Sequence, residues 1–225
     1  MPHALAPIDT WLFDLDNTLY PASCNLFAQI DARMGGFIMD LLAVDAGEAH
    51  RIQKGFFHAH GMTLRGLMTD HGVDAHDFLA HVHDIDLSVV EHDAALVDAL
   101  ARLPGRKLVF TNADLPYAEK VLDRLGLADT FEAIHDVHAM DYRPKPDITA
   151  YRALCDAHGI DPKRTVFVED MARNLVPAKA LGMTTVWIDN GSEQGPAATL
   201  PEHIDYRIAD LGAWLGAIVA ELETA

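Results

Sequence analysis

Two acidic residues separated by one position follow the first apolar run of the chain. Asp14 and Asp16 begin the segment 14–19 (DLDNTL), directly after the β-prone run at residues 10–13. Alternate residues of an extended chain point the same way, so both carboxylates are expected to face one cavity. Their mutual repulsion favours a cation between them, and Mg²⁺ suits such a site because it prefers oxygen ligands, including substrate phosphate oxygens. The structural alternative is a pair of acids that caps a turn or a helix.

Hydroxyl, amide and cationic side chains follow later in the chain. Thr111 and Asn112 end the apolar run at 107–111, and both side chains suit hydrogen bonding to phosphate oxygens. Lys145 lies in the segment 143–146 (RPKP), where its charge would neutralise a phosphate and the acidic pair. N-capping by Thr111 or Asn112 and simple exposure of the lysine are the structural alternatives.

A second acidic pair ends another apolar run. Glu169 and Asp170 follow residues 165–168, and Asn174 comes one helical turn after Asp170. Acids are also common at helix N-termini, where they interact favourably with the helix dipole. However, ligands of open α/β sheets bind at the carboxyl ends of the strands. Polar groups at four successive points of this kind therefore predict one shared site.

The elements that must position these groups alternate along the chain. Near-continuous apolar runs at 10–13, 107–111, 165–169 and 184–188 predict buried parallel strands. Helical spacing occurs at 94–103, 115–125, 148–158 and 175–181, residues 211–222 predict a closing helix, and residues 191–201 predict a loop. This alternation predicts an α/β fold with a doubly wound parallel sheet.

One stretch breaks the alternation. Residues 23–88 contain no convincing buried strand, and amphipathic helical patterns occur at 26–44, 49–57, 64–71 and 77–82. We therefore expect an all-helical insertion after the first strand. The predicted domains are a core formed by residues 1–20 and 91–225 and a helical cap formed by residues 21–90.

Composition excludes several classes of protein. The 225 residues include 17 Lys and Arg against 34 Asp and Glu, a net charge of −17, which argues against a nucleic-acid polymer as the partner. Cys24 and Cys155 are too few for a disulfide framework, so a reducing compartment is expected. Residues 1–7 have no signal-peptide pattern, and no apolar run approaches the roughly 20 residues of a membrane span. These observations predict a cytoplasmic protein without membrane contact, either a monomer or a homodimer.

Taken together, the motifs resemble the haloacid dehalogenase (HAD) superfamily of phosphohydrolases over essentially the whole chain. The resemblance rests on the segment 14–19, Thr111-Asn112, Lys145 and Glu169-Asp170 in that order. It implies a Rossmann-like core in which the strands ending at Asp14, Thr111 and Glu169 are neighbours. It also implies that the helical insertion is the first type of cap domain of this superfamily.

The resemblance implies chemical roles for the first acidic pair. Asp14 would attack phosphorus and form an aspartyl-phosphate, which divides one difficult displacement into two easier ones. Asp16 would protonate the leaving oxygen and later take a proton from the attacking water. Members that cleave carbon–halogen bonds lack the second acid, so Asp16 argues against a dehalogenase.

The resemblance further implies Mg²⁺ as the cofactor and a cradle for the phosphoryl group of a small phosphomonoester. The implied metal ligands are the Asp14 carboxylate, the Asp16 backbone carbonyl and Asp170, supported by Glu169 and Asn174. The implied contacts to the phosphoryl oxygens are Lys145, Thr111 and Asn112.

Two segments, 16–21 (DNTLYP) and 61–67 (GMTLRGL), resemble the branch that contains the pyrimidine 5′-nucleotidases. That resemblance implies a pyrimidine nucleoside 5′-monophosphate, UMP or CMP, as the substrate. Arg65 is the expected cap contact, because a guanidinium binds a phosphate or a base carbonyl with two donors. Tyr20, Phe56 and Phe57 are candidates for stacking on the base, although aromatic residues at helical spacing also fit a core.

Other readings remain open at this point. A sugar-phosphate phosphatase or a phosphomutase would use the same core groups, and a non-catalytic binding module would keep only the fold. Zinc is not expected at His58 and His60 or at His81 and His83, because helical residues two positions apart point to different faces. Cys155 fits the apolar face of a helix and is expected to be packed there.

Overall fold

The computed structural model describes residues 8–191 and 201–224, so the loop expected at 191–201 and the segment 1–7 lie largely outside the described residues. Within these ranges, parallel strands form one sheet in the order β3-β2-β1-β4-β5-β6. The strands are β1 (Thr10–Phe13), β2 (Arg106–Phe110), β3 (Ala133–His135), β4 (Thr165–Glu169), β5 (Thr184–Ile188) and β6 (Tyr206–Ile208).

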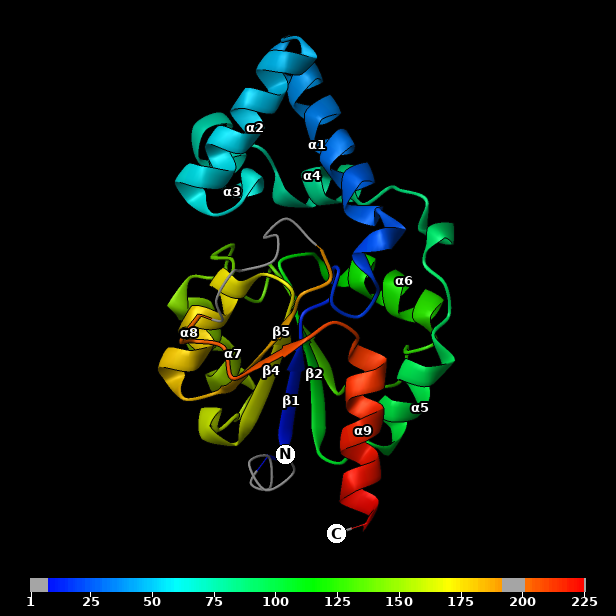
Figure 1. Cartoon of the computed structure of the whole chain (residues 1–225). Coiled ribbons are helices and arrows are strands. Elements are labelled where there is room, and N and C mark those ends of the chain that lie inside the picture. Colours follow the sequence, from blue (N-terminus) through cyan, green and yellow to red (C-terminus); the bar gives the residue numbers. More distant parts are fainter. Residues whose placement is uncertain (1–7, 192–200, 225) are drawn as a thin grey trace.

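Helices cover both faces of this sheet (Figure 1). The helices of this region are α5 (Ala94–Arg102), α6 (Leu115–Leu125), α7 (Ile148–His158), α8 (Leu175–Leu181) and α9 (Leu211–Thr224). In Figure 1, α7 and α8 lie on one side of the strands, and α5, α6 and α9 lie on the other. Every residue of β1 and β4 is buried between these layers. The predicted doubly wound α/β sheet is confirmed.

The register of the central strands aligns their carboxyl ends. Strand β1 pairs with both β2 and β4, and Phe13 lies opposite Val109 on one side and Val168 on the other. The residues that follow Phe13, Val109 and Val168 therefore emerge at one edge of the sheet. The implied adjacency of the strands that end at Asp14, Thr111 and Glu169 is confirmed.

Four helices between β1 and α5 stand over this edge of the sheet (Figure 1). These inserted helices are α1 (Leu26–Leu42), α2 (Ala46–His60), α3 (Thr63–His71) and α4 (Ala75–Val82). Helix α2 begins earlier than the pattern predicted because the Asp45 side chain accepts a hydrogen bond from the Glu48 backbone and caps it. The limits of a separate cap domain stay a prediction. None of the helices in the described part of the chain is long and apolar enough to cross a membrane.

Close packing fixes helix α3 against helix α2. A Cβ atom on Gly66 would lie 2.3 Å from the Phe56 ring, so only glycine lets the two helices approach this closely. Phe56 is therefore used in packing the two helices together. It does not line the cavity described below, which removes it as a stacking partner for a base.

Candidate active site

A buried lysine joins the ends of three strands, β1, β2 and β4. The Lys145 ammonium donates hydrogen bonds to Asp14 Oδ1 at 2.6 Å, Glu169 Oε2 at 2.7 Å and the Phe110 backbone oxygen at 2.8 Å. All three donors of the ammonium are used, and the side chain is 1% exposed. Lys145 is thus an internal counter-charge, and the reading of an exposed loop lysine is excluded.

The charges of this cluster do not balance. One ammonium faces the two carboxylates of Asp14 and Glu169. Burial, together with the charge of Glu169, raises the pKa of Asp14 to about 8 against the opposing effect of Lys145. Burial alone lowers the pKa of Lys145, but the two carboxylates outweigh burial and raise it. A further cation would favour the ionised form of Asp14.

Carboxylate oxygens gather beside this lysine in an arrangement that could hold a metal ion. In the described part of the chain, one oxygen each from Asp14, Glu169 and Asp170 lies within 4.8 Å of the others. The amide oxygen of Asn174, also buried, has no hydrogen-bond partner among the described residues. Buried oxygen donors with excess negative charge fit a hard divalent cation such as Mg²⁺.

Both carboxylate oxygens of Glu169 already accept hydrogen bonds from the protein. One of its oxygens accepts from Lys145 and the other from the Met171 backbone at 3.1 Å. These contacts suit the supporting position that the sequence implies for Glu169. The Asp16 carboxylate is not part of the cluster, which is compatible with the implied use of its backbone carbonyl alone.

The residues after β2 brace the lysine. Asn112 Oδ1 accepts from the Lys145 backbone N–H at 2.9 Å, and Asn112 Nδ2 donates to the Lys145 carbonyl at 3.2 Å. The Thr111 hydroxyl accepts from the Ala113 backbone at 3.1 Å. Asn112 and Ala113 line the cavity, whereas Thr111 is fully buried and does not. Contact of Thr111 with a phosphoryl oxygen stays a prediction.

Two tyrosines hold the second acid of the pair. The Tyr20 and Tyr117 hydroxyls donate to the same oxygen of Asp16, at 2.6 and 2.8 Å. Burial and the adjacent Asp16 charge raise the pKa of both tyrosines above their ordinary value, so both stay protonated donors. Tyr20 is buried with its hydroxyl on Asp16, so the expectation that it stacks on a base is wrong.

His83 supports this arrangement from the segment that follows α4. Its ring stacks on Tyr117 with centroids 4.2 Å apart and planes 18° apart. Its Nδ1 lies 2.8 Å from Asp114 Oδ1. Burial opposes ionisation of Asp114, but the contact with His83 and a backbone hydrogen bond outweigh it and lower the Asp114 pKa. The tyrosine that holds Asp16 is therefore itself held in place.

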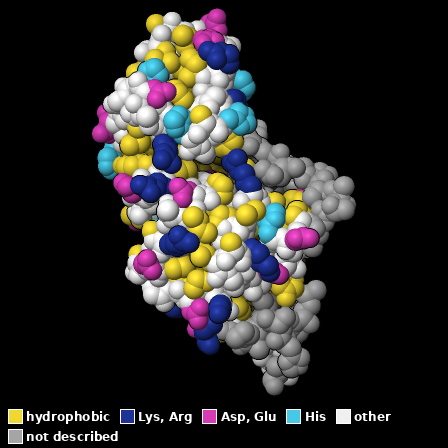
Figure 2. All heavy atoms as spheres, turned by 90° about the vertical axis from the view of Figure 1, so that its left-hand side faces the viewer, with side chains coloured by type: hydrophobic (Ala, Val, Ile, Leu, Met, Phe, Trp, Pro, Cys, Tyr) yellow, Lys and Arg dark blue, Asp and Glu magenta, His cyan; other side chains and the backbone are white. Residues whose placement is uncertain are grey.

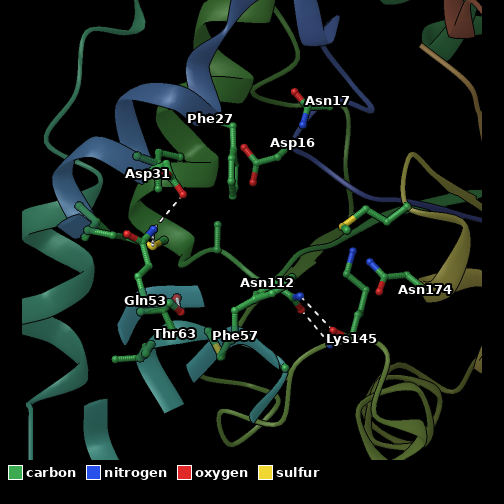
Figure 3. Close-up of a pocket in the computed structure, with 18 of the residues that line it drawn as sticks. Asp16, Asn17, Phe27, Asp31, Gln53, Phe57, Thr63, Asn112, Lys145 and Asn174 are labelled. Carbon is green, nitrogen blue, oxygen red and sulfur yellow. Dashed lines mark hydrogen bonds between the residues drawn. The ribbon is translucent and has the colours of Figure 1, made fainter. Parts of the chain in front are cut away.

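A cavity of about 300 Å³ opens between these groups and the inserted helices (Figure 3). Asp14, Asp16 and Lys145 lie in its wall. The inserted helices supply a largely apolar lining: Phe27, Ile30, Met34, Phe57, Met62, Leu64, Phe78, Leu79 and Val82. An apolar cleft with convergent polar groups and a carboxyl of shifted pKa has the character of an active site.

Comparison with known proteins agrees with this geometry. Residues 8–182 match the family described as haloacid dehalogenase-like hydrolase. The chain belongs to that family. A phosphoglycolate phosphatase of Rhodospirillum rubrum is 30% identical over 221 residues, which cover 91% of this chain and 90% of that protein. Membership in the HAD hydrolases makes the cavity the expected place of hydrolysis.

Two further proteins resemble this HAD hydrolase at lower sequence identity. Phosphate metabolism protein 8 of Saccharomyces cerevisiae is 26% identical over 77% of this chain, and the matched region spans 59% of the yeast protein. The crystal structure of a HAD phosphatase from Thermococcus onnurineus superposes with a TM-score of 0.60 at 18% identity, over 96% of this chain and 97% of that one. At this identity, the likeness to the crystal structure concerns the fold alone.

The arginine that reaches the cavity of this HAD hydrolase differs from the expected one. Helix α3 presents Thr63 and Leu64 to the cavity, and Arg65, about 100° further around the helix, does not line it. Arg173, between Asp170 and Asn174, does line it. Its guanidinium carbon lies 4.6 Å from the centroid of the Phe57 ring, and its buried Nε has no hydrogen-bond partner in the described ranges. The sequence analysis did not single out Arg173.

Within residues 8–191 and 201–224, no histidine belongs to a cluster of three or more side chains that could hold a metal ion. Figure 2 shows several of them at the surface of the inserted helices. His50, His58, His71 and His76 are exposed.

Proposed function

We propose that the protein is a Mg²⁺-dependent phosphatase that cleaves a small phosphomonoester through an aspartyl-phosphate intermediate. The preferred substrate in this proposal is a pyrimidine nucleoside 5′-monophosphate. The observation that carries the proposal is the buried Asp14–Lys145–Glu169 cluster. This cluster and Asp16 line the same largely apolar cavity.

The contacts of Asp14 suit it to attack phosphorus. Oδ1 is held by Lys145 at 2.6 Å, whereas among the described residues Oδ2 accepts only a long contact of 3.4 Å from the Thr18 hydroxyl. Oδ2 is therefore the oxygen available to form the bond to phosphorus as the ester P–O bond breaks. Lys145 stabilises the negative charge that gathers around the phosphoryl group.

Asp16 is suited to move the proton of the leaving group. In the first step it donates a proton to the ester oxygen that leaves phosphorus. In the second step it takes a proton from water, whose oxygen bonds to phosphorus as the bond to Asp14 breaks. The hydroxyls of Tyr20 and Tyr117 keep its carboxyl group aimed into the cavity through both steps.

Asp14 and Asp170, with the Asp16 backbone carbonyl, are the groups proposed to hold Mg²⁺. When bound, the ion screens the nucleophile from the charge of the phosphate and stabilises the charge of the transition state. Glu169 is proposed to support this site through its contacts with Lys145 and the Met171 backbone. Asn174 contributes its unpaired amide oxygen to the same surroundings.

The apolar and aromatic lining of the cavity favours a leaving group larger than a two-carbon acid. Its volume of about 300 Å³ lies at the small end of cavities that enclose ligands. Phe27 and Phe57 stand in the wall, where a flat heterocycle can pack against them. A pyrimidine nucleoside offers such a ring.

A second candidate is a phosphatase that acts on a small ester carrying a carboxylate. The Rhodospirillum rubrum relative is named for phosphoglycolate, and the Arg173 guanidinium in the cavity wall is a suitable partner for a second anion. Phosphatases or mutases of sugar phosphates would use the same catalytic groups. A binding module without catalysis is disfavoured because Asp14, Asp16 and Lys145 are all present and assembled.

The test is release of inorganic phosphate from a panel of UMP, CMP, AMP, ribose 5-phosphate, glucose 6-phosphate and phosphoglycolate. We expect release that requires Mg²⁺, is abolished by EDTA and has its highest kcat/KM with UMP and CMP. Preference for phosphoglycolate would support the second candidate in place of the first. Absence of release from every compound would overturn the proposal.

Replacing Tyr117 by phenylalanine is expected to lower kcat for UMP by about tenfold, because Asp16 loses one of the two donors that orient it. The effect on an aryl phosphate with an acidic phenol should be smaller, since that leaving group needs little help from a proton donor. Steady-state rates on both substrates measure the difference. Equal losses on both would indicate a packing defect and not a role through Asp16.

A further inference from the structure

A polar cluster interrupts the apolar wall of the inserted helices. On α1, the residues that face the cavity are Phe27, Ile30, Asp31 and Met34, spaced as one helical face. On α2, they include Gln53, Lys54 and Phe57. Asp31 accepts hydrogen bonds from Gln53 Nε2 at 2.8 Å and Lys54 Nζ at 3.2 Å. The cluster therefore bridges the two helices at the cavity surface.

The Gln53 side chain is only partly satisfied by the protein. Gln53 is 3% exposed, and burial of a carboxamide is costly unless its polar atoms find partners. A carboxylate can only accept, so the contact with Asp31 directs the NH₂ group of Gln53 toward Asp31. The Gln53 carbonyl oxygen accepts no hydrogen bond from the described residues. This oxygen keeps some exposure, so it is available to a molecule bound in the cavity.

Aromatic and polar side chains alternate by one helical turn on both helices. Phe27 precedes Asp31 by four residues on α1, and Gln53 precedes Phe57 by four residues on α2. Residues four apart are neighbours on one helical face, with Cβ atoms about 5–6 Å apart. Figure 3 shows Asp31 and Gln53 on the opposite side of the cavity from Lys145. A flat ring that packs beside the phenylalanines thus presents its far edge to the polar cluster.

We infer that Asp31 and Gln53 form a subsite that recognises the hydrogen-bonding edge of a pyrimidine base and thereby sets the preference for nucleotides. This inference rests on the proposed phosphatase function, since the phosphate must be held near Lys145 for the base to reach the subsite.

The chemistry of the cluster matches the polar edge of a pyrimidine. Uracil presents an N3–H donor between two carbonyl oxygens, and cytosine presents an amino donor beside N3 and O2 acceptors. Asp31 is an acceptor, Lys54 is a donor, and the Gln53 carboxamide supplies both types of group. Because Asp31 is paired with Lys54, the cluster offers no excess positive charge to a carboxylate-bearing leaving group. The cluster therefore favours a neutral heterocycle with adjacent donors and acceptors.

The experiment compares UMP with ribose 5-phosphate, which carries a primary 5′-phosphate ester and lacks the base. In the wild type we expect a higher kcat/KM for UMP. Gln53→Met keeps the length of the side chain and removes its hydrogen bonds, and Asp31→Asn removes the charge. Each variant is expected to lower the ratio of kcat/KM for UMP to that for ribose 5-phosphate by about tenfold, as expected for loss of buried hydrogen bonds. The kcat/KM for ribose 5-phosphate should stay near the wild-type value.

Asp40→Asn is the matched control, because Asp40 is exposed on the same helix as Asp31. It should leave the substrate ratio unchanged. An unchanged ratio in both Gln53→Met and Asp31→Asn, or an equal loss on both substrates, would overturn the subsite. A wild type that hydrolyses other phosphomonoesters but does not prefer UMP to ribose 5-phosphate would also overturn it and leave phosphatase activity standing. Absence of hydrolysis of any ester would refute the proposed function itself.

Discussion

Replacing Asp14 by asparagine is expected to lower the rate of phosphate release from UMP by about 10⁴-fold or more. An amide oxygen is a far weaker nucleophile than a carboxylate, so the bond to phosphorus does not form. Asparagine has nearly the same shape and can still accept the hydrogen bond that Lys145 donates to Asp14 Oδ1. The loss should therefore be one of chemistry and not of folding. Rates at saturating UMP and Mg²⁺, followed by phosphate release, measure it.

A second readout identifies the covalent step directly. Acid-quenched wild-type protein should carry one additional phosphoryl group in its intact mass during turnover, and the Asp14→Asn protein should not. Asp40→Asn makes the same chemical change at an exposed position and should keep the wild-type rate. Wild-type-like thermal unfolding of Asp14→Asn would confirm that the protein is folded. A loss smaller than about 100-fold would mean that another group attacks phosphorus, because even a residue that only assists as a general acid or base contributes about 10²–10⁴-fold.

The central strands were predictable because each contains a short, near-continuous apolar run. Strands β3 and β6 were not, since each has three residues and lies at an edge of the sheet. Arg207 in the middle of β6 is exposed, so that strand has no continuous apolar signal. The pairing of an edge strand depends on the neighbour already in place, which a local pattern does not record.

The acidic groups of the site were predictable because they end strands that the sequence itself reveals. Asp14 follows β1, and Glu169 ends β4, so parallel pairing alone brings the two together. Lys145 was identified as a charge near a phosphate, but its burial was not. Its ammonium bonds to Asp14 across 131 positions of sequence, and only the folded chain reveals that contact.

The contacts that surround the acids were harder to foresee. Tyr117 reaches Asp16 across 101 positions from the first turns of α6, where its local pattern shows only a buried helical face. Arg65 does not line the cavity because one step along a helix turns a side chain by about 100°, and sequence alone does not fix which face meets the cavity. The sequence shows that Phe27 and Asp31 are four positions apart and could share a helical face, as could Gln53 and its neighbours. The same spacing is equally typical of helices packed against each other.

Asp16 has a role that substrate choice can isolate. A nucleoside 5′-hydroxyl is a poor leaving group and must be protonated as it departs, whereas an acidic phenol leaves as its anion. The two tyrosine hydroxyls hold the Asp16 carboxyl group at the cavity wall, which places the proton donor beside the departing oxygen. Loss of the proton donor should therefore lower the rate chiefly for substrates whose leaving group needs a proton.

Replacing Asp16 by asparagine is expected to lower kcat for UMP by about 10²–10⁴-fold, the usual contribution of a general acid. An aryl phosphate with an acidic phenol should lose less than about tenfold, because its leaving group needs no proton. Measuring kcat for a series of aryl phosphates of increasing phenol pKa tests this directly, since the variant should depend on leaving-group pKa more steeply than the wild type. Parallel dependences, with one common loss across the series, would assign Asp16 to the metal site or to folding. A steeper dependence on leaving-group pKa would instead support Asp16 as the proton donor and leave Asp14 as the nucleophile. The proposed mechanism depends on this division of roles between the two acids.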